Sequence, residues 1–198
     1  MKYWALGTLR QWHWISSALC LAGMLLFAVT GVTLNHAALI EARPTVHSLD
    51  IQLPDELMPL LPQMAEQNTL PTPLRNWLRT ELGVRFSFEQ ADWSDNELYL
   101  GLPRPGGDAW LTLDLGTGEL FYESTDRGWI AYANDLHKGR HTGLAWSWFI
   151  DLFAGVCVVF SLTGLWLLQR QARTRPSTWP LTGLGLLVPV LIALLFIH

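Results

Sequence analysis

Three long apolar runs, separated by one long polar segment, dominate the pattern of this chain. The runs cover residues 15–34, 146–168 and 179–197, and each has about the ~20 residues that a helix needs to cross a ~30 Å hydrocarbon core. The eleven tryptophans lie mostly near the ends of these runs, where amphipathic rings favour the membrane interface. We predict three transmembrane helices, the first of them retained, because its run continues into Asn35 and His36 without a small-residue cleavage site.

The polar segment between the first two runs carries the signals of a small folded domain. Residues 41–73 are rich in proline and short polar runs, which predicts a loop with one short helix near residues 56–67. The next stretch, PLRNWLRTELG at 73–83, repeats leucine and tryptophan at helical spacing and ends in glycine. This pattern predicts a short amphipathic helix.

After Gly83 the apolar period changes from that of a helix to that of a strand. The sequences VRFSFEQ, ELYLGL, AWLTLDL and ELFYES alternate or run apolar, and the turn sequences WSDN, PRPGGD and GTG separate them. We therefore predict three or four antiparallel strands. Together with the preceding helix they would form a small α+β domain of roughly fifty residues at about residues 73–125.

The expected fold is an α-helical membrane protein with a small α+β domain inserted between its first two transmembrane helices. It has a tail and first helix at 1–36, the segment holding the domain at 37–133, a histidine-bearing approach and second helix at 134–169, a loop at 170–178 and a third helix at 179–198. The two cysteines, Cys20 and Cys157, lie inside apolar runs and predict buried thiols rather than a disulfide framework.

The distribution of charge predicts the orientation of the three spans in the membrane. The short segments 1–14 and 169–178 carry five basic residues and no acidic ones. The segment 35–145 holds sixteen of the seventeen acidic residues and eight of the thirteen basic ones, a net charge of −8. Because basic flanks stay on the cytoplasmic side, we expect a multi-pass protein of a bacterial inner membrane, with a cytoplasmic N-terminus and its polar segment in the periplasm.

Histidines gather on the predicted outer side. His36 ends the first apolar run, and His137 and His141 precede the second, so all three reach the same membrane level. Imidazoles at facing helix ends suit the axial pair of a low-spin haem, and interface anchoring is the alternative for each. The spacing of His137 and His141 also admits a metal site on one helical face. Zinc would need a further ligand such as Asp135, and Gly139 weakens the case for a helix there.

Three polar residues close to those histidines are further candidates. Asp151 lies about one turn inside the second apolar run, where an acid is costly and marks a functional position. It could pair with Arg140, orient an axial histidine or relay a proton. Arg140 and Lys138 could contact haem propionates, or they could be ordinary partners of lipid headgroups.

Two further features lie in or next to the apolar runs: His13 and a repeated motif. His13 lies in QWHW at the inner end of the first run, 23 residues before His36, or about 34 Å along a helix, so the two cannot share a metal. It would serve a second, inner cofactor, with a symmetric homodimer as one way to complete the site, or it would anchor the interface. The motif F-x-x-T-G-x-x-L occurs at 27–34 and 160–167. Its Thr-Gly pairs permit close helix approach or clear room for a flat cofactor.

The sequence resembles the PepSY-associated transmembrane proteins. The residues that carry the resemblance are RQWHW at 10–14, TGVTLNH at 30–36, LHKGR at 136–140, SLTGLWL at 161–167 and AWLTLDLGTGEL at 109–120. The last of these is similar to the strand, D-x-x-T-G-E turn and strand of a PepSY module. Larger relatives include inner-membrane ferric-siderophore reductases that carry b-type haems. The resemblance implies an axial pair of His36 and His137, with His13 at the family's inner histidine position and His141 as a substitute.

On this basis we expect a haem-b-containing electron-transfer protein, a transmembrane oxidoreductase that reduces a metal or ferric chelate. One haem would lie at the outer side and a second at the inner side. No flavin or nicotinamide motif is recognisable, so a quinol or a protein donor would supply electrons to a periplasmic ferric siderophore, metal complex or redox partner. The alternative is a cofactor-free, membrane-anchored PepSY module that binds or regulates a periplasmic protein or peptidase. Neither hypothesis involves nucleic acid.

Overall fold

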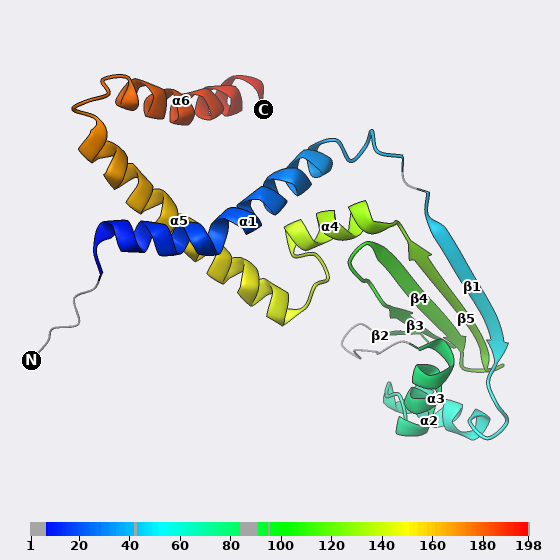
Figure 1. Cartoon of the computed structure of the whole chain (residues 1–198). Helices are drawn as coiled ribbons and strands as arrows, with labels where there is room; N and C mark the ends of the chain where they lie inside the picture. The colour runs from blue at the N-terminus through cyan, green and yellow to red at the C-terminus, as the bar shows by residue number, and fades with distance from the viewer. Residues whose placement is uncertain (1–6, 42, 84–90, 95, 198) are drawn as a thin grey trace, which may run out of the picture. The chain divides into compact units, whose positions relative to one another are not determined.

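A computed structural model describes residues 7–41, 43–83, 91–94 and 96–197 (Figure 1). The helices long and apolar enough to cross a membrane are α1 (Leu9–Asn35), α5 (Leu144–Gln171) and α6 (Thr178–Phe196). Each contains an 18-residue stretch whose mean hydropathy is 2.0 or more. The three predicted spans are confirmed as helices of sufficient length and apolarity, which makes the chain a multi-pass membrane protein.

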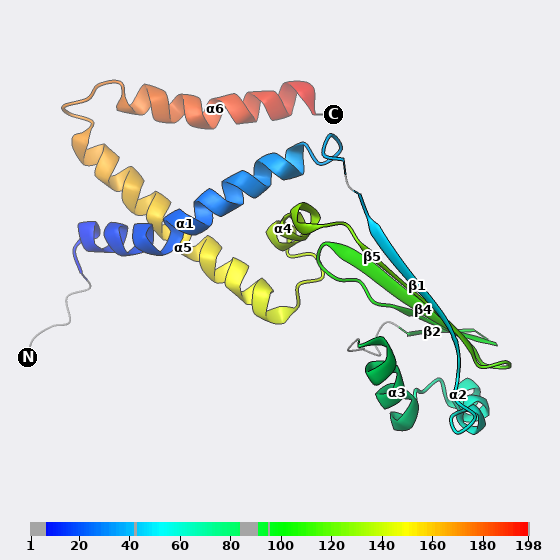
Figure 2. The same cartoon turned by 45° about the vertical axis from the view of Figure 1, so that its right-hand side comes forward.

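The chain divides into two compact units, residues 1–28 with 148–198 and residues 29–147. In the first unit α1 and α5 cross in opposite directions (Figure 2). Gly23 of α1 lies at this crossing, and a Cβ there would overlap the ring of Phe153. A small residue is needed at this position because larger ones would hold the two helices apart.

Among the residues that the structure describes, the second unit contains a five-stranded antiparallel sheet in the order β1-β5-β4-β3-β2. The strands are β1 (Thr45–Gln52), β2 (Ala91–Trp93), β3 (Glu97–Gly101), β4 (Gly107–Asp114) and β5 (Glu119–Asp126). Between β1 and β2 the chain forms η1 (Met58–Leu60), α2 (Leu61–Gln67) and α3 (Thr72–Leu82), and α4 (Trp129–Lys138) follows β5.

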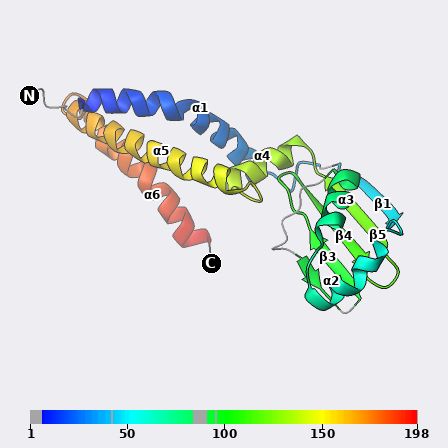
Figure 3. The ribbon, with the colours of Figure 1, turned by 90° about the horizontal axis from the view of Figure 1, so that it is seen from below.

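Leucines that alternate along the strands build the core of this unit. Leu98 pairs with Leu113 and Leu100 with Leu111 across β3 and β4, and each is at most 1% exposed. The helices contribute Leu61, Met64, Leu74 and Leu78 to the same core. Figure 3 shows α2 and α3 lying across this face of the sheet. The predicted small α+β domain between the first two spans is therefore confirmed.

The prediction of a loop at 41–73 is wrong at its start. Residues 45–52 form β1, which pairs with β5 from Thr45↔Asp126 to Gln52↔Glu119. The short helix predicted near 56–67 corresponds to η1 and α2, and the helix predicted at 73–83 corresponds to α3. The predicted strand VRFSFEQ, residues 84–90, lies outside the described residues.

The turn between β4 and β5 explains the D-x-x-T-G-E sequence. Asp114 Oδ1 accepts the backbone N–H groups of Gly116, at 2.8 Å, and Thr117, at 2.7 Å. These hydrogen bonds favour the carboxylate and hold the pKa of Asp114 below its ordinary value. Gly118 has φ +74°, and a Cβ there would overlap the sulfur of Met58.

Replacing Gly118 with alanine should destabilise the sheet unit by roughly 2–4 kcal/mol, because left-handed backbone strain and overpacking act together. Thermal unfolding of the detergent-solubilised full chain measures the effect. Gly101→Ala is the control, since a Cβ at Gly101 meets only the ring edge of Tyr99, at 3.8 Å. Equal melting temperatures for the two variants would contradict the packing of Gly118 against Met58.

Candidate cofactor-binding site

The first of two histidine sites, the Thr163 seat, consists of His13, Phe160, Thr163 and Gly164. His13 Nδ1 lies 3.0 Å from Thr163 Oγ1, and the His13 ring stacks on Phe160 with 4.9 Å between ring centroids. A Cβ on Gly164 would lie 3.3 Å from His13 Cε1. The glycine therefore provides the space in which the imidazole lies.

The hydrogen bonds of Thr163 determine which nitrogen of His13 carries the proton. The Thr163 hydroxyl lies 2.7 Å from the carbonyl oxygen of Val159 and 3.0 Å from that of Phe160. A carbonyl only accepts, so the hydroxyl proton points to the α5 backbone and the hydroxyl oxygen accepts the Nδ1–H of His13. Neutral His13 then keeps on Nε2 the lone pair with which imidazole binds a metal.

The second site, the Thr30 seat, consists of His137, Thr30 and Gly31. His137 Nδ1 lies 2.6 Å from Thr30 Oγ1, and a Cβ on Gly31 would lie 3.8 Å from His137 Cε1. In both seats the histidine thus lies beside the Thr-Gly pair of the repeated F-x-x-T-G-x-x-L motif, although a Cβ on Gly31 would be at an ordinary contact distance. In each seat the pair receives a histidine from a different helix, α1 in one case and α4 in the other.

Helix α4 holds His137 at the Thr30 seat through a second contact on the same face. Asn134 precedes His137 by three residues, so the two side chains share one side of the helix. Thr33 donates its hydroxyl to Asn134 Oδ1 over 2.6 Å, next to the contact between Thr30 and His137. The helix ends at Gly139, which has φ +65° and serves as a left-handed C-cap.

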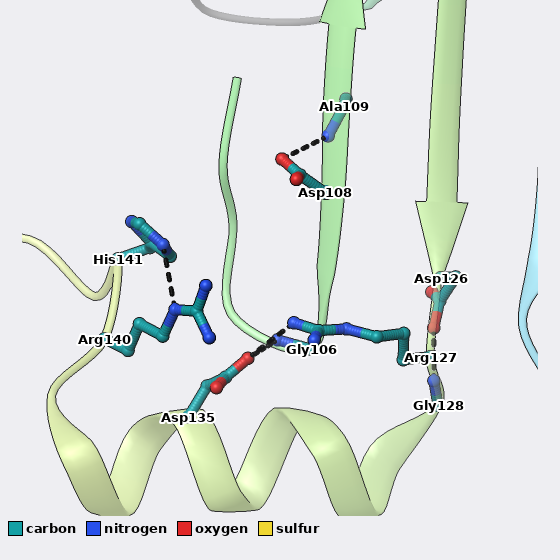
Figure 4. Close-up of polar contacts among 9 residues, drawn as sticks. All are labelled: Gly106, Asp108, Ala109, Asp126, Arg127, Gly128, Asp135, Arg140 and His141. Carbon is teal, nitrogen blue, oxygen red and sulfur yellow. Dashed lines mark hydrogen bonds and ion pairs between the residues drawn. The ribbon is translucent and has the colours of Figure 1, made fainter. Parts of the chain in front are cut away.

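A buried carboxylate fastens the opposite face of α4 to the sheet (Figure 4). Asp135 is 5% exposed, and its Oδ2 accepts the backbone N–H of Gly106 over 2.9 Å and a guanidinium N–H of Arg127 over 3.1 Å. A Cβ on Gly106 would lie 2.7 Å from Tyr132 Cα, so only glycine lets the β3–β4 turn approach the helix this closely. We call Asp135, Gly106 and Arg127 the Asp135 latch.

A groove of about 600 Å³ adjoins the Thr163 seat. Its lining residues are His13, Phe160, Ser161, Gly164, Leu165, Leu167, Leu168 and Gln171. The volume falls within the roughly 300–1,000 Å³ of ordinary ligand pockets. An imidazole beside an aromatic ring and leucines suits haem, which needs a nitrogen ligand for iron and apolar walls for the macrocycle.

The other predicted histidines make different contacts. His36 is exposed, and its Nδ1 lies 3.0 Å from the carbonyl oxygen of Val32 in its own helix. His141 has φ +57° and accepts the Nε–H of Arg140 over 3.1 Å. Because α4 ends at Lys138, His137 and His141 do not share one helical face, and a metal site at the two residues stays a prediction. The described residues also contain no group of three or more His, Cys, Asp or Glu able to hold a metal ion.

Asp151 lies on α5 beside a groove of about 420 Å³ that residues of α1 also line, among them Trp12 and Ser16. Its predicted roles in pairing, histidine orientation or proton relay stay predictions. Cys20 is buried and Cys157 is half-buried, and both are free thiols. Thr30 and Thr163 were missed as histidine partners in the sequence, although the repeated motif was their signal.

Three spans, with a sheet domain inserted between the first two, define a polytopic membrane protein whose soluble domain is bound through α4 to the end of its first span. A model of the PepSY_TM-like family matches residues 4–198. The chain therefore belongs to this family, as the sequence motifs predicted. Searches of curated proteins and of solved structures found no match.

Proposed function

We propose that this chain is a haem-b-binding electron-transfer protein of the bacterial inner membrane, with His13 and His137 as iron ligands in two separate sites. The observation that carries the proposal is the repeated histidine seat. Histidines that bind metals commonly direct their other ring nitrogen to an oxygen, which fixes the ring and the tautomer. Both His13 and His137 direct Nδ1 to a threonine hydroxyl in this way.

Bound haem would supply reversible one-electron chemistry. His13 and His137 would hold iron through Nε2, while Thr163 and Thr30 keep the rings oriented. Apolar side chains of α5 line the groove beside His13. At the other seat, Lys138 and Arg140 follow His137 directly and supply positive charge for propionates. His36 is the candidate for a second ligand beside His137, with His141 as its substitute.

The charge pattern supports a direction for electron flow. The basic flanks favour a cytoplasmic N-terminus, and the acidic sheet unit would then lie in the periplasm. A quinol or protein donor would deliver electrons at the membrane. The acceptor would be a periplasmic ferric chelate, such as a ferric siderophore, or a redox protein that approaches the sheet unit.

An absorption spectrum of the full chain tests the proposal. Protein purified from haem-replete cells should show a reduced-minus-oxidised b-type spectrum. His13→Ala and His137→Ala should each remove part of it, because each deletes one iron ligand. His47→Ala is the matched control, since His47 lies on exposed β1, where it pairs with Ser124 of β5.

A colourless wild-type preparation would overturn the proposal. It would favour the alternative, in which the sheet unit binds or regulates a periplasmic protein or peptidase without a cofactor. A haem-bound preparation whose spectrum survives both histidine substitutions would instead show that other residues ligate the iron.

A further inference from the structure

The Thr163 seat offers one strong iron ligand and no second one. Apart from His13, the groove beside it is lined by Phe160, Ser161, Gly164, Gln171 and leucines. None of these supplies an imidazole, thiolate, thioether or amine. In the sequence, residues 7–28 and 148–197 contain His13 as their one histidine. A bis-histidine haem at this seat therefore needs its second imidazole from outside these residues.

We propose that a second copy of this chain supplies that ligand, so that His13 of each copy binds one face of a shared haem. This inference rests on the proposed function. Two identical chains related by a two-fold axis along the membrane normal place the same residue on both sides of the axis. A single histidine per chain then provides the two equivalent imidazoles of a bis-histidine haem.

The surfaces around the seat suit such a neighbour. Ser161 and Gly164 are small residues beside His13 in the groove wall, and small residues allow close approach between membrane helices. The spans also bury little against each other, with 11% of the apolar window buried in α1 and 6% in α5. Much of each helix surface is thus open to lipid or to another copy.

The seat also fixes the geometry that a shared site requires. Thr163 holds Nδ1–H of His13, so Nε2 is the nitrogen presented to the iron in both copies. Phe160 stacks on the ring and restricts its rotation. Two rings set in the same way need little reordering when they bind one iron between them, which favours shared binding over recruitment of an unrelated ligand.

Mixed assemblies provide the test. Two copies with different affinity tags, both carrying His137→Ala to remove the outer haem, are expressed together, and assemblies holding both tags are purified. When neither copy has a further change, we expect about one low-spin haem per two chains, as a two-fold site requires. When one copy also carries His13→Ala, electron paramagnetic resonance should show complete loss of the low-spin signal.

The controls keep the two proposals distinguishable. His47→Ala in one copy should leave the signal intact, and His13→Gln replaces His13→Ala if that variant fails to accumulate. A haem-loaded monomer, or a mixed assembly that keeps half of the low-spin signal, would overturn the shared site and leave the proposed function standing. Wild-type protein without haem would overturn the proposed function itself.

Discussion

Replacing Asp135 with alanine should release α4 from the sheet and lower the free energy of unfolding by about 2–3 kcal/mol, because charged hydrogen bonds lose their buried acceptor. Gly106 would keep a buried N–H without its partner, and the Arg127 guanidinium would lose its carboxylate. Thermal unfolding of the full chain measures the loss. Hydrogen exchange should also rise in α4 and in the β3–β4 turn.

Asp108→Ala provides the matched control for this prediction. Asp108 lies near the same turn (Figure 4), but it is exposed and its Oδ1 accepts the N–H of its neighbour Ala109. Asp135→Asn should be intermediate, because an amide oxygen can still accept from Gly106 but carries no charge for Arg127. If Asp135→Ala and Asp108→Ala melt alike, the Asp135 latch does not stabilise the unit.

Replacing Thr163 with valine should weaken haem binding at the Thr163 seat by about 10- to 100-fold, the usual effect of removing the group that orients a metal-binding histidine. Valine keeps the shape but has no oxygen to accept Nδ1–H. Thr163→Ser should restore much of the affinity, because it keeps the hydroxyl. Haem titration in the His137→Ala background, together with the midpoint potential of the remaining haem, provides the measurement.

Thr182→Val serves as the control for general effects on the spans. Thr182 lies in α6 and donates its hydroxyl to the carbonyl oxygen of Thr178 over 2.9 Å, so it resembles Thr163 in its backbone contact. Unchanged haem affinity in Thr163→Val would show that the contact with His13 has no role in orienting a ligand.

The apolar pattern predicted most of the fold, because most elements are either apolar throughout or bury one face. The spans are continuous apolar runs, whereas α3 and strands β3 to β5 repeat apolar residues at the spacing of their secondary structure. Strand β1 was not predicted, for the opposite reason. Seven of its eight side chains are exposed, so no alternation marks it, and its place depends on hydrogen bonds to β5, which follows it by more than sixty residues.

The sequence marked His13 and His137 as candidates, but it did not predict the threonines that they contact. His137 and Thr30 are 107 residues apart, and His13 and Thr163 are 150 apart. No local pattern specifies contacts over such distances. The repetition of F-x-x-T-G-x-x-L was visible in the sequence, yet only the fold shows that both copies of the motif receive an imidazole.

In each seat the histidine and the threonine come from segments far apart in the chain, which affects when the seats can form during biosynthesis. His137 is synthesised after Thr30, so the Thr30 seat has no histidine until translation has passed residue 137. His13 is synthesised early, but the Thr163 that it contacts is added only later. Neither seat can be complete when the first span enters the membrane. Stable cofactor loading should therefore come late, after the second span has been inserted, and nascent chains truncated before residue 163 should not retain haem at His13.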